Sequence, residues 1–344
     1  MFFICVTTMA WGGWQQSFRR VPEAISTLVP IFGSITFVVL IYVVFIGHNH
    51  HIYHWIDDAA VEADPILKGK KGFLNTKFFL VWTTLAITLW SVLGWRMRKL
   101  SSEADEAAMD HETGASFIKR NTVVAAMFLV WFGLTVGSTI PWLWMMSIDA
   151  HWYSTMYSWY TFASSFVSGM SLIALWVIYL KNKGYLEYTN QEHLHDIGKF
   201  MFAFSVFWTY LWFSQYMLIW YANIPEETVY FKHRVQGPYK GIFFLNLIVN
   251  FLAPLLILMK RAAKRNYTLV TFMAIVILFG HWIDFYQMIM GSVSKEHVTL
   301  GWLDFGILSL FVGLMILFTG KALASKPLIP KHHPFLKESI LHHT

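Results

Sequence analysis

The stretch YTLVTFMAIVILFGHWIDFYQMIM, from Tyr267 to Met290, decides the fold because it is apolar and long enough to cross a bilayer as one helix. It carries His281 and Asp284 inside its apolar part, and Gln287 follows. Steps of three residues place these three side chains on one face of a helix.

A carboxylate within the hydrocarbon of a bilayer is costly unless it has a partner, a cavity or a proton. We therefore expect the face of Asp284 to point into a protein interior. Two interpretations of His281 and Asp284 stay open. They either hold and pass protons, with or without a quinone, or form a hydrogen-bonded pair that only holds helices together.

The composition extends this interpretation to the whole chain. Its 344 residues are 56% hydrophobic and only 13% charged, whereas soluble domains carry roughly 25% charged residues. This predicts an all-α polytopic membrane protein, and the long unbroken apolar runs exclude a transmembrane β-barrel. The net charge of +6 is typical of basic loops at a membrane surface and is poor support for nucleic-acid binding.

Eight apolar runs are long enough to be full transmembrane helices. They cover about 24–46, 78–95, 121–146, 152–180, 200–221, 241–259, 267–290 and 302–320. We expect two four-helix bundles with flanking helices, and the N-terminal helix or helices missing or partial. The divisions are a partial span and linker (1–20), a first bundle (21–180), a cytoplasmic connector (181–199), a second bundle (200–320) and a cytoplasmic tail (321–344).

The lysines and arginines predict the orientation of these helices. Most of the 26 basic residues fall in alternate connections, around 19–20, 96–120, 181–199 and 260–265, and in the tail. Such connections face the cytoplasm. We therefore expect a multi-pass protein with a cytoplasmic C-terminus. The first 14 residues are apolar but show no signal-peptide pattern.

Redox centres are not expected in this chain. Its only cysteine is Cys5, too few for an iron–sulfur cluster or a c-type haem attachment. Only His281 lies well inside a span, so two facing haem ligands are not expected. The run from Gly47 to His54, GHNHHIYH, is open to three interpretations: a metal site, a proton-buffering loop or an ordinary surface loop.

Three further residues are candidates for proton handling on the predicted outer side. Asp149 and His151 lie in a short turn between two spans, and Asp304 lies one turn into the last span. Asp149 has an alternative role, as a cap of the helix that starts near Trp152.

The run 200–221 mixes aromatic and polar residues, and this pattern is typical of either helix packing or an apolar slot for a flat quinone ring. The candidates for a quinone pocket are Tyr210, Gln215, Tyr216 and Trp220.

Four motifs carry a resemblance to a known family. They are FWTYLWFSQYMLIWYANIPEETVYF (Phe207–Phe231), SIDAHWYSTMYSWY (Ser147–Tyr160), YLKNKGYLEY (Tyr179–Tyr188) and GHWIDFYQMIM (Gly280–Met290). On these, the chain resembles the second large membrane subunit of bacterial alternative complex III, a quinol:cytochrome c oxidoreductase. That subunit is similar to the membrane subunits of polysulfide and nitrite reductases.

The resemblance implies a location in the bacterial cytoplasmic membrane and a role in electron transport without redox cofactors of its own. It implies four kinds of partner: a homologous membrane subunit, an iron–sulfur subunit, haem c subunits and often a terminal oxidase. The clusters and haems then lie in those partners, and a quinone such as menaquinone is the candidate ligand here. His281, Asp284, Asp149 and His151 are the matching polar positions.

An ion or solute transporter is the alternative from another class. Transporters bind their substrates at broken helices near the middle of the membrane. Pro141 and Pro254 lie inside or near span ends, but we expect no matching interruptions in the two halves.

Overall fold

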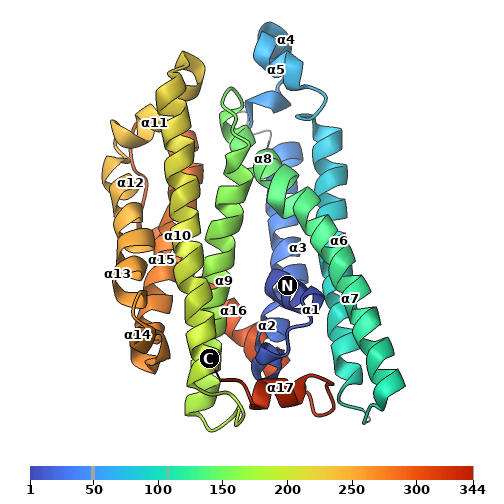
Figure 1. Ribbon diagram of the computed structural model, residues 1–344. Helices are drawn as coiled ribbons and strands as arrows, with labels where there is room; N and C mark the ends of the chain where they lie inside the picture. The colour runs from blue at the N-terminus through green and yellow to red at the C-terminus, as the bar shows by residue number, and fades with distance from the viewer. Residues whose placement is uncertain (48–50, 107, 344) are drawn as a thin grey trace.

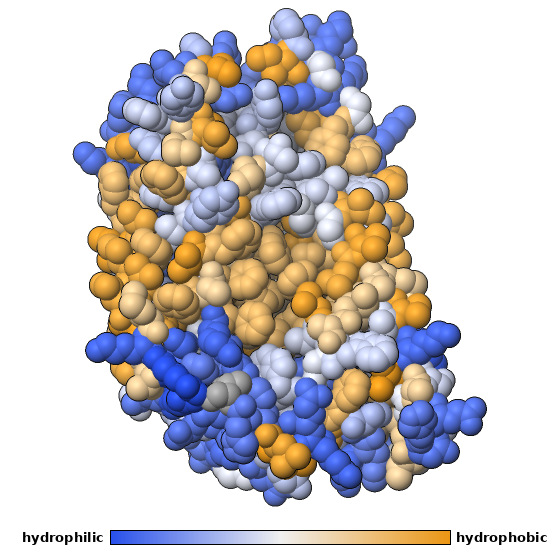
Figure 2. Space-filling view, viewed as in Figure 1, coloured by the Kyte–Doolittle hydropathy of each residue, from blue (hydrophilic) through white to orange (hydrophobic). Residues whose placement is uncertain are grey.

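The computed structural model describes residues 1–47, 51–106 and 108–343, and within them the regular elements are helices, with no strand. Seven helical segments are long and apolar enough to cross a membrane. They are Arg20–Ile46, Thr76–Glu103, His111–Trp144, Met156–Asn182, Lys240–Leu258, Tyr267–Val293 and Trp302–Ala324. Figure 2 shows a band of apolar side chains across the molecule, with hydrophilic side chains at both ends. The chain is an all-α polytopic membrane protein, as its composition predicts.

The first group of helices comes from the N-terminal part of the chain. Its members are α1 (Phe2–Met9), α2 (Arg20–Ile25), α3 (Leu28–Ile41) with η2 (Tyr42–Ile46), α6 (Thr76–Glu103), and α7 (His111–Leu134) with η4 (Thr135–Thr139) and α8 (Ile140–Trp144). Here α7 packs against both α1 and α6, and α6 also packs against α3 (Figure 1).

The second group holds α15. It comprises α9 (Met156–Asn182), α10 (Gln191–Ala222), α12 (Lys240–Leu247) with η6 (Ile248–Leu252) and α13 (Ala253–Leu258), and α15 (Tyr267–Val293). Although the sequence division puts α9 in the first bundle, it packs most extensively against α10 and α15. The packing therefore places α9 in the second group, and residues 181–199 join two helices of that group. Helix α16 (Trp302–Ala324) packs against α2 and α3.

Short elements lie at the two ends of the long helices. They are η1 (Trp14–Phe18), η3 (His54–Ile56), α4 (Asp58–Ala63), α5 (Pro65–Lys70), η5 (Met146–Asp149), α11 (Pro225–Val235), α14 (Arg261–Arg265) and α17 (Leu336–Ile340). Figure 1 shows α4, α5 and α11 at one end and α14 and α17 at the other. We call these the α11 end and the α17 end.

Helix α10 contains the predicted span 200–221 but differs from that prediction. It begins well before residue 200 and is 32 residues long, yet it is not among the seven spans. Its tryptophans, tyrosines and polar residues lower its hydropathy. Helix α10 is therefore long enough to cross a membrane, and it differs from the seven spans in its lower hydropathy. Its polar residues instead supply part of the buried site described below.

Asparagine and aspartate side chains start the long helices. Asn75, Asp110, Asn190 and Asn266 each accept a hydrogen bond from a backbone N–H in the first turn of α6, α7, α10 and α15. These N–H groups have no partner within their own helix, and such a cap stabilises a helix by about 1 kcal/mol.

Each of the two prolines considered in the sequence follows a π-helical turn. Pro141 comes just after η4 and Pro254 just after η6. Proline has no N–H for the helix ladder, and its ring clashes with the preceding turn, so a wider turn relieves the clash. The spans that contain Pro141 and Pro254 are thus interrupted, although the sequence predicted no matching breaks in the two halves. The second of these turns, η6, contains the buried Asn250.

The C-terminal segment folds back over the α17 end. Ser339 Oγ donates to the carbonyl oxygen of Trp14 over 2.6 Å and accepts from the N–H of Ser17 over 2.9 Å. It also lies 3.1 Å from His193 Nε2 on α10. The segment joins the first group of helices to the second group.

The docking of this segment should weaken in acid. Burial, with a smaller contribution from His342, lowers the pKa of His193 from 6.5 to about 4. Burial beside Arg19 and Arg20 also lowers the pKa of His333. An undocked segment would let these histidines take up protons near pH 6.5, so docking loses stability as the pH falls from 6.5 towards 4.

For His193 alone, we expect a loss of up to about 2 kcal/mol at pH 5. Hydrogen exchange of residues 336–341, corrected for the intrinsic effect of pH, should be faster at pH 5 than at pH 7.5, while α15 stays protected. Equal corrected rates at the two pH values would contradict this expectation.

Candidate functional site

The polar face of α15 is buried, as the spacing of its residues predicts. His281 and Asp284 are each 1% exposed and Gln287 is 4% exposed. Helix α15 turns this face towards α9, with which it packs closely, and towards α10 and α12. The site therefore lies inside the second group of helices and does not face lipid.

Three side chains from two neighbouring helices donate hydrogen bonds to Asp284. The Tyr160 hydroxyl of α9 donates to Oδ1. On Oδ2, Trp208 Nε1 of α10 donates over 3.0 Å and Ser164 Oγ over 3.3 Å. Charge-assisted bonds of this kind compensate a buried carboxylate for the water it has lost.

His281 is linked to Asp284 through Ser164. Its Nδ1 lies 2.8 Å from Ser164 Oγ but 3.8 Å from Asp284 Oδ2, which is beyond hydrogen-bonding distance. The ring lies edge-on to Trp208, with the centroids 5.4 Å apart. Among the described residues, no atom pairs with His281 Nε2. One hydroxyl thus bridges two groups that can each hold a proton.

Arg234 is a further buried residue that the sequence does not single out, because it lies in a short polar segment between two predicted spans. It lies on α11 and is only 2% exposed. Its guanidinium lies 3.5 Å from the centre of the Tyr230 ring, which stacks on Trp152. The guanidinium also donates to Ser292 Oγ over 3.0 Å and to the carbonyl oxygen of Met288 over 3.2 Å. The buried residues of α11 share a face, and that spacing was the available signal.

A small cavity lies between Arg234 and Asp284. Its volume is about 20 Å³, which is room for one water molecule. Tyr160, Gln215 and Gln287 also line it. Among the described residues, Gln215 Oε1 is buried with no hydrogen-bond partner. A water molecule here could bridge the carboxylate, the guanidinium and this amide.

A chain of amides extends the site along α12. Asn246 Nδ2 donates to Gln287 Oε1 over 2.6 Å, and Asn250 Nδ2 lies 3.5 Å from Asn246 Oδ1. Gly280 lets η6 come close to α15, because a Cβ there would lie 2.6 Å from Val249 Cγ1 and closer still to Asn250 Oδ1.

Gly280→Ala should therefore push η6 away and destabilise the protein by about 1–3 kcal/mol. Gly313→Ala on α16 is the matched control, because its Cβ would meet nothing within 4 Å. We expect that control to be neutral or slightly stabilising in a helix. Chemical unfolding of the two variants checks the prediction, and equal midpoints would contradict it.

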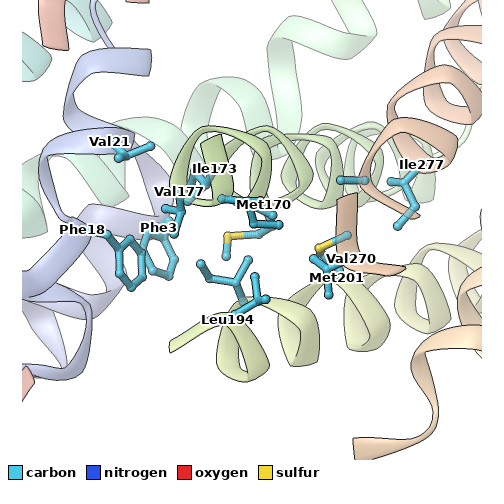
Figure 3. Packing of buried hydrophobic residues seen from close by; sticks show 14 of the residues in the cluster. Phe3, Phe18, Val21, Met170, Ile173, Val177, Leu194, Met201, Val270 and Ile277 are labelled. Carbon is cyan, nitrogen blue, oxygen red and sulfur yellow. The ribbon is translucent and has the colours of Figure 1, made fainter. Parts of the chain in front are cut away.

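Apolar side chains close the site on the side of the α17 end. Ile277, one turn from His281, is fully buried, as are Met201 and Met273. They belong to one apolar cluster that continues to Val270 and Leu194 (Figure 3). Apolar packing thus separates the Asp284 site from the polar side chains at the α17 end.

Asp149 does not cap α9. That helix begins at Met156, and its N-cap residue Thr155 makes no side-chain cap. Asp149 instead ends η5, and its Oδ1 lies 3.5 Å from Lys295 Nζ. The capping alternative is wrong, because the chain makes a further turn before the helix starts.

His151 and Asp304 lie apart from the buried site. Exposed His151 lies with Nε2 2.5 Å from Asp64 Oδ2, and this hydrogen bond holds the pKa of Asp64 below its usual range. Asp304 Oδ2 accepts from the N–H of Gly301 over 2.8 Å and so caps α16.

The four candidates for a quinone pocket do not lie together. Tyr210 and Trp220 are 61% and 65% exposed on the outside of α10. Tyr216 packs against Phe231, and Gln215 alone lines the small cavity. Because α10 turns these residues to different sides, they do not line a common slot.

The histidine-rich loop lies partly outside the described residues, since these exclude His48 and His50. His51 and His54 are exposed. In the part of the chain that the structure describes, no group of three or more His, Cys, Asp or Glu side chains could hold a metal ion.

These features define the class of the molecule, a multi-pass α-helical membrane protein with a buried cluster of ionisable side chains. Comparison of the chain with protein-family models and with curated proteins found no match.

Proposed function

We propose that this chain is a membrane subunit of a respiratory quinol:electron-acceptor oxidoreductase of the alternative complex III type. In it, the Asp284 cluster, defined as Asp284, His281, Tyr160, Ser164 and Trp208, handles the protons of the quinol. The observation that carries the proposal is the burial of this cluster beside a water-sized cavity. The family is proposed from the resemblance that the four sequence motifs carry.

The charges around the cavity support a role in proton transfer. Asp284 and Arg234 line the same cavity, so a carboxylate and a guanidinium both face the space that one water molecule would fill. The hydrogen bond from Tyr160 and the bridge through Ser164 to His281 offer two routes for a proton that reaches Asp284. Groups so arranged can accept and release protons during turnover.

The apolar cluster around Ile277 supports a direction for this transfer. Water and protons do not readily cross a close-packed apolar region, so exchange would occur through the α11 end. The basic connections predict that this end faces away from the cytoplasm. We propose that the cluster releases quinol protons to that side and does not pump protons across the membrane.

The rest of the assembly is proposed from the resemblance. The electrons would pass through iron–sulfur and haem c subunits, next to a homologous membrane subunit, in the bacterial cytoplasmic membrane. The C-terminus would be cytoplasmic. An accessory quinone site would have to form around Gln215, because the other three candidates lie elsewhere on α10.

One observation favours an ion or solute transporter as a second candidate. The π-helical turns before Pro141 and Pro254 interrupt two spans, and broken helices are a feature of transporters. Purification distinguishes the two functions. The protein is tagged, kept at its natural expression level and purified from a membrane extract. Recovery of a haem-containing complex is expected, and a lone, colourless protein that binds a solute would overturn the proposal.

A further inference from the structure

A large polar cavity lies at the α17 end, well away from the Asp284 cluster. Its volume is about 800 Å³, and its walls come from α2, α6, α7 and the end of α16. This is within the range of small-molecule binding sites, about 300–1,000 Å³. Nothing in the proposed function uses this cavity.

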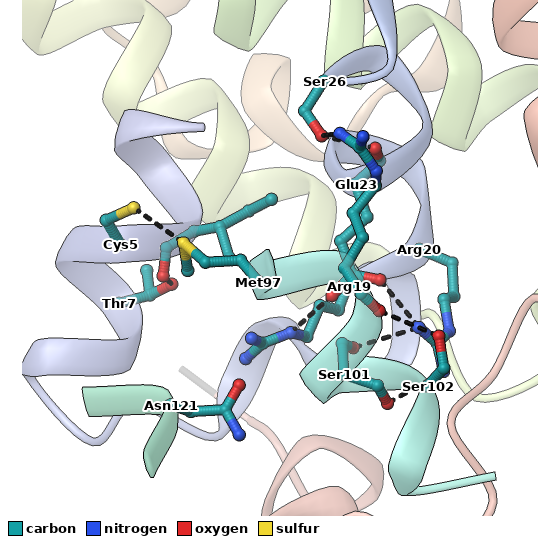
Figure 4. Close-up of polar contacts among 12 residues, drawn as sticks. Cys5, Thr7, Arg19, Arg20, Glu23, Ser26, Met97, Ser101, Ser102 and Asn121 are labelled. Atoms are coloured by element: carbon teal, nitrogen blue, oxygen red, sulfur yellow. Dashed lines mark hydrogen bonds and ion pairs between the residues drawn. The ribbon is translucent and has the colours of Figure 1, made fainter. Parts of the chain in front are cut away.

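One wall of the cavity is a fixed network of ion pairs. Glu23 is buried between Arg19 and Arg20, at 2.9 and 2.8 Å (Figure 4). Arg20 also pairs with Asp105 over 2.5 Å and donates to Ser101 Oγ over 3.0 Å. Both arginines lie where the sequence predicts a basic connection between spans, but both are buried.

Positive charge is left over in the cavity once these pairs are counted. Arg120 pairs with Glu103, and Glu106 is the remaining carboxylate in the lining. In addition, Arg98, Lys99 and Lys326 line the cavity, and within the described part of the chain none of the three forms an ion pair. The surroundings are therefore suited to an anion.

The position of the cavity favours an anion that is attached to a lipid. Trp95, which is largely exposed, and Leu323 contribute an apolar edge. Further along α16, the apolar side chains of Leu310, Ile316 and Leu317 are exposed as well. A headgroup in the cavity would thus have apolar helix surface beside it for its acyl chains.

We propose that this cavity binds the phosphate headgroup of an anionic phospholipid. Arg98, Lys99 and Lys326 would contact the phosphate, and Trp95 would lie at the level of the glycerol, as tryptophans do at membrane interfaces. Basic pockets between helices on the cytoplasmic side are known to hold such headgroups. The inference does not depend on the proposed respiratory function.

The test uses the full chain in the assembly in which it is isolated, delipidated in a non-ionic detergent. Thermal unfolding is followed during titration with dioleoyl phosphatidylglycerol. Dioleoyl phosphatidylcholine and soluble glycerol phosphate are titrated in parallel. We expect phosphatidylglycerol alone to raise the melting temperature, because a ligand that binds the folded state stabilises it.

The test variant is Lys99→Gln/Lys326→Gln, because both lysines are exposed and their loss should not prevent folding. Its apparent affinity for phosphatidylglycerol should fall about 30-fold, since each lysine near an anionic lipid contributes about a factor of five. Arg98→Gln is a second variant with the same expected direction. Lys183→Gln/Lys260→Gln is the matched control, as these exposed lysines lie outside the cavity and should leave the affinity unchanged.

Three outcomes would overturn the proposal. Phosphatidylcholine could stabilise the protein equally, so that the phosphate charge is not recognised. Soluble glycerol phosphate could act as well as the lipid, so that the ligand is a free phosphate compound. The cavity variants could keep the affinity of the wild type, as expected if a partner chain covers the cavity.

Discussion

In the proposed complex, Asp284→Asn should slow quinol oxidation by about 10²-fold while leaving assembly and haem content unchanged. Asparagine keeps the shape of the side chain but cannot take up a proton. Its single oxygen can accept a hydrogen bond from Tyr160 or from Trp208 but not from both, because these two donors bond to different oxygens of Asp284. Loss of a positioned acid or base typically costs 10²–10⁴-fold in rate. Steady-state turnover of the purified complex measures the effect.

Asp304→Asn is the matched control for this prediction. Asp304 caps α16 at the α11 end and lies apart from the buried site. Its replacement should cost at most about 1 kcal/mol of stability and leave turnover unchanged. If Asp284→Asn also turned over at the wild-type rate, the Asp284 cluster would only hold helices together.

Arg234→Gln should have the largest effect on stability, about 3–5 kcal/mol. The change removes the cation from the cavity that it shares with Asp284 and takes the donor away from Ser292 Oγ and the Met288 carbonyl oxygen. Buried charged and polar groups that lose such interactions are strongly destabilising. It also removes the stacking of the guanidinium on Tyr230. Chemical unfolding of the purified complex measures the difference in the free energy of unfolding between Arg234→Gln and the wild type.

The double variant Arg234→Gln/Asp284→Asn makes this prediction specific. If the two groups interact across the cavity, the double variant should be more stable than the sum of the single effects implies, with a coupling of about 0.5–3 kcal/mol. Lys232→Gln, two residues along α11 and exposed, should change stability by less than about 0.5 kcal/mol. A coupling of zero would show that Arg234 acts only through packing.

The α15 site was partly predictable because an ionisable group inside an apolar run is visible without a structure. The run itself predicts that His281, Asp284 and Gln287 share a buried face, and this is confirmed. Their partners Tyr160 and Trp208 could not be found this way, since they come from distant parts of the chain and depend on how α9 and α10 pack.

At other places, the charge pattern of the sequence predicts exposed residues where the structure buries them. Arg234 follows Glu226, Glu227 and Lys232 in a short polar segment, which is typical of an exposed loop, yet one face of that segment is buried. Arg19 likewise lies in a connection that the sequence predicts to be basic and exposed to the cytoplasm. In the structure, it is buried by Glu23 and the surrounding helices. Such reversals depend on tertiary ion pairs, which spacing alone does not reveal.

A count of the protons released in sealed vesicles during quinol oxidation tests the proposed role of the Asp284 cluster in the intact complex. The protons of the quinol, and no others, should appear on the side of the α11 end, and Asp284→Asn should slow their release. Uptake of further protons from the side of the α17 end would contradict it, because the apolar cluster around Ile277 would then have to conduct.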